Sequence, residues 1–315
     1  MAKGWWAANV VLTLVVIALA VINLNQHFFN YPALAYQLFH SAEEQYGDVT
    51  LLEVAPFPVL IESAESPPNV NAVAAVAIDM NHKTILFSKN EREVFYPAST
   101  TKMVTALVAM DVFELDDVIA IAHDDIAFGN GLGFAVGEQL TVDSLIKANL
   151  IRSSNESSLA LANHSPYGYR DFMNRMNDLV TTLGLTESFF TNPVGFDDPG
   201  QRSSAFDLAI LAKELLRNDY LAEIVGMAEY SFYNVEQTRS RTIRNTNLFL
   251  FDQNLPFEVF GVKTGTTRLA NEVLVTGVES EGNRFLIVVL GSNDRYNDTR
   301  IIANYVIDNF SWQNW

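Results

Sequence analysis

The chain has no cysteine, and it is poor in basic residues and in histidine. Without cysteine it can form no disulfide, no zinc–thiolate site and no thiol nucleophile. Its 20 lysines and arginines stand against 37 aspartates and glutamates, a formal charge of −17 that repels phosphates and argues against a nucleic-acid partner. Its five histidines are His27, His40, His82, His123 and His164. They show neither an i, i+4 pair nor an HExxH motif, so we expect no bound metal and no cofactor.

The chain is rich enough in apolar residues to bury a core. Its 315 residues are 49% hydrophobic and 18% charged, which allows one or two domains. The run from Trp5 to Leu24 is uncharged and long enough to cross a bilayer as a helix. We therefore expect residues 1–25 to be a transmembrane signal-anchor, with Lys3 on the cytoplasmic side. The protein would then lie in the cell membrane as a single-pass protein, with the remaining chain extracytoplasmic.

A cleaved signal peptide is the alternative interpretation of this run. Ala18 and Ala20 form an A-x-A pattern after the apolar segment 10–17, and cleavage there would leave a secreted protein. The apolar stretch continues beyond Ala20, so its length favours the anchor. Residues 26–70 then mix aromatics, prolines and acids without periodicity, and we expect them to form an extracytoplasmic linker.

Residues 71–315 are predicted to form one α/β unit. The apolar runs 71–79 and 84–90 flank a turn and indicate a β-hairpin. Residues 115–217 show mainly helical patterns, whereas the sequence beyond residue 230 is β-rich and closes on an amphipathic helix. Strands at both ends with helices between them predict a sheet that the C-terminal third completes.

A helix that begins near Ser99 carries the first of three short motifs. Ser99 and Thr100 can cap this helix, and Met103, Val104 and Leu107 recur at helical spacing. The three motifs occur in order along the chain: Ser99-Thr100-Thr101-Lys102, Ser153-Ser154-Asn155 and Lys263-Thr264-Gly265.

The first motif suits acyl transfer. Residues three apart on a helix share a face, so the hydroxyl of Ser99 can meet the amine of Lys102. A lysine can act as a base when burial or a neighbouring cation lowers its pKa, and Lys263 is a candidate for that cation. Unpaired N–H groups at the helix N-terminus would favour the negative charge of a tetrahedral intermediate. The pattern predicts Ser99 as the nucleophile.

Each motif alone is a weak signal. The S-x-x-K pattern recurs at residues 144–147, which we interpret as a helix start followed by a solvated lysine, and S-x-N recurs at 88–90, at the end of a strand. K-T-G occurs once, after the apolar run 257–262, where Gly265 would let a substrate approach the backbone. The three motifs together favour a functional interpretation, because each supplies a separate part of one mechanism.

With their surroundings, the motifs resemble the D-alanyl-D-alanine carboxypeptidases, the S11 serine peptidases among the low-molecular-weight penicillin-binding proteins. The resemblance covers about residues 70–312 and includes TNPVGFDD, SSAFDLAIL and RNTNLFL. It implies a penicillin-binding-protein/β-lactamase-like transpeptidase fold, in which helices flank an antiparallel sheet beside a mainly helical subdomain. It also implies removal of the terminal D-alanine from peptidoglycan stem peptides through an acyl-enzyme, with β-lactams as covalent inhibitors.

The resemblance gives the residues of the first two motifs their roles. Ser99 attacks the carbonyl between two terminal D-alanines, and Lys102 acts as its base. Ser153 helps to pass the proton to the leaving amine, and Asn155 holds the substrate amide.

The resemblance also assigns the third motif and a distant arginine. Lys263 and Thr264 line the opposite wall of the cleft, and the backbone N–H groups of Thr266 and the nucleophile form the oxyanion hole. Arg295, assisted by Thr264 and Thr266, binds the terminal carboxylate. The alternative interpretation of Arg295 is a surface arginine at a helix end.

The sequence departs from the family pattern at three places. Gln201 stands where a histidine is frequent, Glu156 replaces an aspartate, and Ala270-Asn271 replaces Ala-Gly. The C-terminal β domain and amphipathic anchor of many relatives do not follow. None of these departures touches the nucleophile, the base or K-T-G, so they bear on substrate preference and not on the chemistry.

Three further functions remain open at this point. A class A β-lactamase-like hydrolase needs an extra glutamate, for which Glu187 is the candidate, although its context matches the carboxypeptidases. A D,D-endopeptidase would use the same residues on cross-linked peptides. A catalytically idle peptidoglycan-binding or scaffold relative would have no need of Lys102.

Overall fold

A computed structural model describes residues 55–127 and 129–314, and residues 57–313 form one compact unit. The expected membrane helix, residues 1–25, lies outside the described residues. Among the helices that are described, none has the length and apolar character needed to span a membrane.

The compact unit begins earlier than residue 71. Strand β1 (Phe57–Leu60) falls within the expected linker, yet it pairs antiparallel with β11 (Phe310–Gln313) at the other end of the chain. Further along, the Ile61 N–H donates to the Asn309 carbonyl at 3.0 Å, and the Glu65 N–H donates to the Asn309 side-chain oxygen at 2.5 Å. These long-range contacts draw residues 57–70 into the fold.

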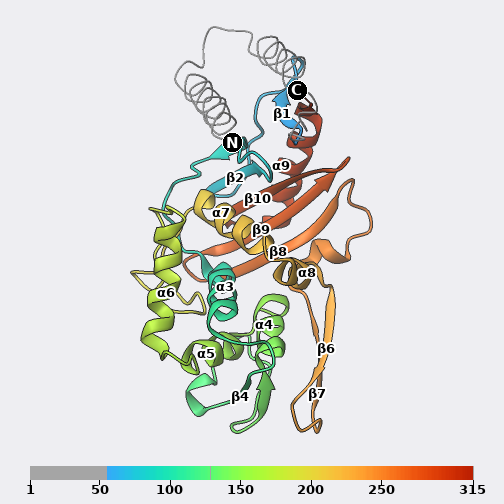
Figure 1. Cartoon of the computed structure of the whole chain (residues 1–315). Helices are drawn as coiled ribbons and strands as arrows, with labels where there is room; N and C mark the ends of the chain where they lie inside the picture. Colours follow the sequence, from blue (N-terminus) through green and yellow to red (C-terminus); the bar gives the residue numbers. More distant parts are fainter. Residues whose placement is uncertain (1–54, 128, 315) are drawn as a thin grey trace, which may run out of the picture. The chain divides into compact units, whose positions relative to one another are not determined.

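The centre of the unit is a five-stranded antiparallel sheet with the order β3-β2-β10-β9-β8 (Figure 1). The predicted N-terminal hairpin and three of the four β-rich runs predicted beyond residue 230 belong to it, so the expectation of one sheet built from the two ends of the chain is confirmed. The strands are β2 (Ala74–Asp79), β3 (Ile85–Lys89), β8 (Glu258–Thr267), β9 (Asn271–Ser280) and β10 (Asn283–Ser292).

Helices cover both faces of this sheet, which explains why its central strands are apolar throughout. Alternate residues of a strand point to opposite faces. On β10, Leu286 and Val288 join the core beneath the helical section, whereas Phe285 and Ile287 pack with α9 (Arg295–Asn309) on the other face.

Along the sequence, the predicted helical section lies between β3 and β8, and it is present in the structure (Figure 1). Its helices are α3 (Lys102–Val112), α4 (Val142–Ile151), α5 (Asn155–Asn163), α6 (Tyr169–Thr182), α7 (Ala205–Leu216) and α8 (Asp219–Gly226). Two small two-stranded antiparallel sheets accompany them, β4 (Val118–Ala120) with β5 (Gln139–Thr141) and β6 (Glu229–Tyr233) with β7 (Ser240–Arg244). Short 3-10 turns are η1 (Ala98–Thr101), η2 (His123–Asp125) and η3 (Leu248–Phe251).

Candidate active site

Ser99 lies in the turn η1, directly before α3. The expectation that Ser99 or Thr100 caps the helix is wrong, since neither side chain makes a capping hydrogen bond. The Thr100 hydroxyl instead donates to the carbonyl of Pro97 at 2.6 Å. Ala98 has a φ of 49°, in a region that non-glycine residues rarely adopt. This strained turn leaves the Ser99 hydroxyl to a different partner.

That partner is Lys102. Its amine is 3.1 Å from the Ser99 hydroxyl oxygen, and it donates to the Asn155 side-chain oxygen at 3.0 Å and to the Val194 carbonyl at 2.6 Å. The side chain is fully buried, with 0% exposure. Burial, and then the charge of Lys263, holds the pKa of Lys102 well below its ordinary value. The environment therefore favours the neutral amine, the form that can accept a proton.

Lys263 comes from β8 and is the neighbouring cation that the sequence predicted. Its side chain is 1% exposed, and its amine donates to the carbonyl of Thr264 at 3.0 Å. Burial lowers the pKa of Lys263 to about 7, and the charges of Arg295 and Arg152 act in the same direction. Both lysines of the site are therefore held in surroundings that disfavour their charged forms.

Two glycines allow the chain to close around the nucleophile turn. A Cβ on Gly265 would lie 2.9 Å from the Ser99 nitrogen and 2.9 Å from the Ala98 Cβ. A Cβ on Gly195, whose φ is +90°, would lie 1.9 Å from the Ala98 carbonyl oxygen. Strand β8 and the 192–196 loop therefore both pack directly against the turn, and both close approaches require a residue without a side chain.

Gly265→Ala is expected to lower the rate of acylation by a β-lactam by about a hundredfold, because relieving the clash moves β8 away from the Ser99 N–H. Gly226→Ala is the control, since its Cβ would meet the Phe260 carbonyl at an ordinary 3.8 Å. Stopped-flow or gel-based labelling measures both rates. Equal acylation by the two variants would contradict the need for close approach.

The second motif faces the same cleft. Ser153 has a φ of 63° and is 2% exposed, and its hydroxyl has no hydrogen-bond partner in the described structure. Ser154 caps α5 by accepting from the Ser157 N–H at 3.1 Å. Asn155 begins that helix and accepts the hydrogen bond from the Lys102 amine. The middle residue of the motif is thus structural, and the outer two present polar groups to the site.

Arg295 opens α9 and lies in the wall of the cleft. One of its terminal nitrogens donates to the Gly265 carbonyl and to the Thr266 hydroxyl, both at 2.9 Å. Its Nε is buried without a partner among the described residues. The Thr264 hydroxyl donates to the Thr246 hydroxyl at 2.6 Å. Arg295, Thr264 and Thr266 are therefore grouped as the family resemblance implies, and Arg295 is not a solvated helix-end arginine.

The cleft that these residues line has a volume of ≈ 580 Å³. Lys102, Asn155 and Lys263 are buried. The Lys102 amine contacts Ser99 and the Lys263 amine contacts Thr264, and both of these partners line the cleft. The lining residues are Ser99, Asn130, Leu132, Arg152, Ser153, Thr242, Ile243, Arg244, Asn245, Thr246, Leu248, Thr264, Gly265, Thr266 and Arg295. Every predicted site residue therefore belongs to one region of the molecule.

Arg152, Arg244 and the 192–196 loop carry no motif and were not predicted from the sequence. The two arginines add positive charge to the cleft of an acidic protein, and Arg152 directly precedes the second motif. In the loop, the Asn192 side-chain oxygen accepts the N–H groups of Val194 at 3.2 Å and Gly195 at 2.8 Å, which aims the Val194 carbonyl at Lys102. The signal for this loop was the N-P-V-G sequence, to which no role had been given.

Gln201, one of the departures, ties this loop to the nucleophile helix. Its side-chain oxygen accepts from the Thr191 N–H at 2.7 Å and the Asn192 N–H at 3.3 Å, and its nitrogen donates to the Thr101 hydroxyl at 2.9 Å. A neutral amide that donates and accepts at once fills this buried position without any change of charge.

Glu156, the second departure, shapes the opposite rim. Its buried carboxylate accepts from the Leu132 N–H at 2.6 Å and more distantly from the Phe134 N–H at 3.5 Å. Gly131 passes so close that a Cβ there would lie 2.8 Å from the carboxylate. Leu132 and Asn130 of this loop line the cleft, so Glu156 positions a wall of the site.

The second S-x-x-K lies on α4 and has the opposite electrostatics. Thr141 caps that helix by accepting the Ser144 N–H, as expected of a structural helix start. Lys147 is not solvated, because its amine pairs with Asp143 at 2.6 Å and its side chain is 14% exposed. Burial alone lowers the pKa of Lys147, but the hydrogen bond and charge of Asp143 outweigh burial and raise it. Lys147 therefore stays protonated and cannot serve as a base.

The fold belongs to the penicillin-binding-protein and transpeptidase class. The crystal structure of the Streptomyces K15 DD-transpeptidase superposes with a TM-score of 0.73 and 26% sequence identity, over 78% of this chain and 100% of that one. The antiparallel sheet with flanking helices that the sequence predicted is therefore confirmed.

The sequence comparison narrows this class to one family. A sequence profile of the D-alanyl-D-alanine carboxypeptidases, peptidase family S11, matches residues 61–294, and the chain belongs to this family.

Two curated members show how far the similarity extends. The chain is 33% identical over 230 residues to the D-alanyl-D-alanine carboxypeptidase DacF of Bacillus subtilis (strain 168), covering 70% of this chain and 58% of that protein. It is 32% identical over 276 residues to the D-alanyl-D-alanine carboxypeptidase DacC of Escherichia coli (strain K12), covering 82% of this chain and 67% of that protein. This chain thus matches about three fifths to two thirds of each relative's length.

Proposed function

We propose that this protein is a serine-type D-alanyl-D-alanine carboxypeptidase that removes the terminal D-alanine from peptidoglycan stem peptides. The observation that carries the proposal is the fully buried Lys102 amine, 3.1 Å from the Ser99 hydroxyl, with its pKa lowered by burial and by Lys263. A buried neutral amine beside a hydroxyl is what a serine nucleophile needs when no histidine serves as its base. Membership of the S11 family supports the same reaction.

The first half of the reaction is acylation. Lys102 takes the proton from the Ser99 hydroxyl as the oxygen attacks the carbonyl between the last two D-alanines. The Ser99 N–H, beside which Gly265 packs, and the Thr266 N–H stabilise the oxyanion. The C–N bond then breaks, and Ser153, whose buried hydroxyl has no partner among the described residues, relays the proton to the leaving amine.

The second half is hydrolysis of the ester on Ser99. Water attacks the acyl carbonyl, the same N–H groups hold the negative charge, and the proton returns to the Ser99 oxygen. Asn155, held by Lys102, is placed to fix the substrate amide through both steps.

The charges of the cleft support an anionic ligand. Arg152, Arg244 and Arg295 line it, and Lys102 and Lys263 lie beneath it, in a protein whose formal charge is −17. We assign the terminal carboxylate to Arg295, because its guanidinium is held at the Gly265–Thr266 segment of β8 by two hydrogen bonds. β-Lactams, whose strained amide mimics an acyl donor with a nearby carboxylate, are the expected covalent inhibitors.

The assignment of Arg295 gives a test of substrate class. The wild type is expected to release D-alanine from a peptide ending in D-Ala-D-Ala, and to prefer the free carboxylate over its C-terminal amide. Arg295→Gln should reduce kcat/KM for the free acid by about 10- to 100-fold and leave the slow reaction of the amide nearly unchanged. Chromatographic measurement of released D-alanine or its amide follows both substrates. An equal loss of kcat/KM on the free acid and on the amide would contradict the assignment of Arg295 to the terminal carboxylate.

The acceptor of the acyl group is the point where related functions diverge. The Streptomyces neighbour is named a DD-transpeptidase, and transfer to an amine would share every step up to the acyl-enzyme. A D,D-endopeptidase would share the chemistry with a larger leaving group. A product that contains an added amine, with no free acid, would favour transfer over the carboxypeptidase reaction.

A β-lactamase-like hydrolase and an idle scaffold fit the site less well. Glu187, the candidate deacylating base of a β-lactamase-like enzyme, pairs with Arg92 at 3.4 Å and is not one of the described residues that line the cleft. A scaffold would gain nothing from a buried lysine whose pKa is lowered beside a serine, since burying an amine costs free energy.

We also propose that residues 1–25 anchor the protein in the cell membrane, that the segment up to β1 is a linker and that the catalytic unit is extracytoplasmic. The uncharged run from Trp5 to Leu24 supports the anchor. Peptidoglycan lies outside the membrane, so the proposed substrate supports the orientation. Secretion after cleavage of the signal is the alternative.

A further inference from the structure

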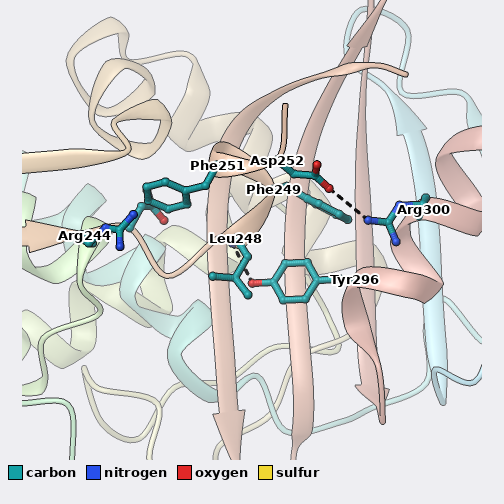
Figure 2. Close-up of a pocket in the computed structure, with 8 residues that line it drawn as sticks. Arg244, Leu248, Phe249, Phe251, Asp252, Tyr296 and Arg300 are labelled. Carbon is teal, nitrogen blue, oxygen red and sulfur yellow. Dashed lines mark hydrogen bonds and ion pairs between the residues drawn. The ribbon is translucent and has the colours of Figure 1, made fainter. Parts of the chain in front are cut away.

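A second groove adjoins the Arg295 end of the cleft. It has a volume of ≈ 480 Å³ and lies between η3 and the first half of α9. Figure 2 shows Arg244 and Arg300 on opposite sides of it, with Leu248 and Tyr296 between them. The lining residues are Arg244, Asn245, Leu248, Phe249, Phe251, Asp252, Tyr296 and Arg300.

The groove and the cleft are joined by shared residues. Arg244, Asn245 and Leu248 line both. Tyr296 follows Arg295 directly; its hydroxyl donates to the Thr246 carbonyl at 3.0 Å and accepts from the Leu248 N–H at 3.0 Å. The boundary between the two depressions therefore lies at the Arg295 end of the cleft. Leu248 is 60% exposed there, so its apolar side chain is open to a ligand.

The chemistry of the groove combines apolar walls with two guanidinium groups. Arg300 stacks over Phe249 at 5.5 Å, and Arg244 stacks over Phe251 at 4.6 Å. Both arginines already have acidic neighbours, Asp252 at 3.5 Å from Arg300 and Glu229 at 2.7 Å from Arg244. Half-exposed pairs of this kind are weak and leave donors for a further carboxylate.

We propose that this groove is a subsite for a leaving group that extends beyond D-alanine and carries a second carboxylate on an apolar stem. The inference rests on the proposed function, because it takes the Arg295 end of the cleft as the leaving-group side. A leaving D-amino acid that binds Arg295 through its α-carboxylate would direct a long side chain past Leu248 and Tyr296. Its far carboxylate would then meet Arg300. The favoured substrates would include cross-linked stem peptides, whose leaving residue continues into an acidic chain.

The test uses the full chain and two matched substrates that differ in one charge. Both are N-acylated peptides ending in D-Ala-D-lysine, with the lysine side chain either succinylated, which adds a carboxylate, or acetylated, which is neutral. The wild type is expected to show about a fivefold lower KM for the succinyl substrate. Arg300→Gln should remove this preference while leaving release of D-alanine from a plain D-Ala-D-Ala peptide unchanged.

Arg284→Gln is the matched control, because Arg284 also pairs with a carboxylate at 3.5 Å, on Glu279, and stacks over an aromatic ring, Phe260. It should keep the preference. If the wild type cleaves the plain peptide yet treats the two lysine substrates alike, the subsite is refuted and the carboxypeptidase function stands.

A binding measurement tests the groove independently of peptide cleavage. Calorimetric titration with free Nε-succinyl-D-lysine and Nε-acetyl-D-lysine should show the same fivefold preference, again lost in Arg300→Gln. If no peptide is cleaved but this preference is found, the groove stands and the proposed reaction fails. Equal affinities for the two amino acids would overturn the subsite.

Discussion

Replacing Ser99 with alanine is expected to lower kcat/KM for release of D-alanine by on the order of 10⁴- to 10⁶-fold, because no acyl-enzyme can form without the attacking oxygen. Covalent labelling by a fluorescent penicillin should disappear as well. The substitution removes one oxygen from a turn held by the Thr100 and Thr101 hydroxyls, so the thermal midpoint should change little. Binding of a non-hydrolysed peptide should persist.

The chain supplies a matched control for this substitution. Ser144 begins the other S-x-x-K, and its hydroxyl lies 3.0 Å from the Thr141 hydroxyl at the start of α4. Ser144→Ala should retain labelling and D-alanine release within about twofold of the parent, with at most a small loss of stability. Labelling of Ser99→Ala at the parent's rate, or loss of labelling in Ser144→Ala, would contradict the assignment of Ser99 as the nucleophile.

Replacing Lys102 with methionine is expected to lower the acylation rate by about 10²- to 10⁴-fold, the usual contribution of a general base. Methionine has a similar length and keeps the site apolar, so the loss reports the amine and not the packing. Lys102→Arg should be equally impaired, because a guanidinium is never a base at accessible pH. Stopped-flow acylation by a chromogenic β-lactam measures the rates.

The pH dependence of the wild type follows from the same lysine. The reactive form is the neutral amine, which exists above the pKa of Lys102, so acylation should be lost as pH falls through that pKa. Because burial and Lys263 hold this pKa well below its ordinary value, acylation should persist at pH values well below those at which an ordinary lysine becomes protonated. Lys147→Met is the control, and it should show the parent's pH profile, since Asp143 keeps Lys147 protonated. A wild-type acid limb at the pKa of an ordinary lysine would contradict Lys102 as the base.

The sheet and the three motifs could be predicted because their signals are local. The hairpin 71–90, the apolar strand before K-T-G and the three-residue spacing from Ser99 to Lys102 each lie in a short stretch of sequence. The structure confirms that hairpin as β2 and β3 and the K-T-G strand as β8. The grouping of the three motifs around one cleft is what the resemblance to the S11 peptidases implies.

The errors arose where the deciding contacts are distant in sequence. The predicted linker ends at residue 70, which is too late because β1 pairs with β11, near the other end of the unit. The sequence predicts a solvated Lys147, whereas Asp143 and the Tyr230 ring, 4.6 Å from its amine, enclose it. The Val194 carbonyl that accepts a hydrogen bond from Lys102 could not be predicted, because every residue has a backbone carbonyl whatever its side chain.

The capping error has a different cause. Serine and threonine at a helix start usually cap it. In this turn, however, Thr100 donates to the carbonyl of Pro97 and Ser99 faces the Lys102 amine. The Ser99 side chain is oriented toward the Lys102 amine and therefore cannot cap the helix. Helix propensity rules do not take such a catalytic contact into account.

The central claim, an acyl-enzyme on Ser99, is tested most directly by mass spectrometry of the full chain after brief reaction with a penicillin. We expect a mass increase of one penicillin per chain, and fragmentation of the peptide that spans residues 93–102 should place the adduct on Ser99. An unmodified chain, or an adduct on Ser144 or any other residue, would contradict the account.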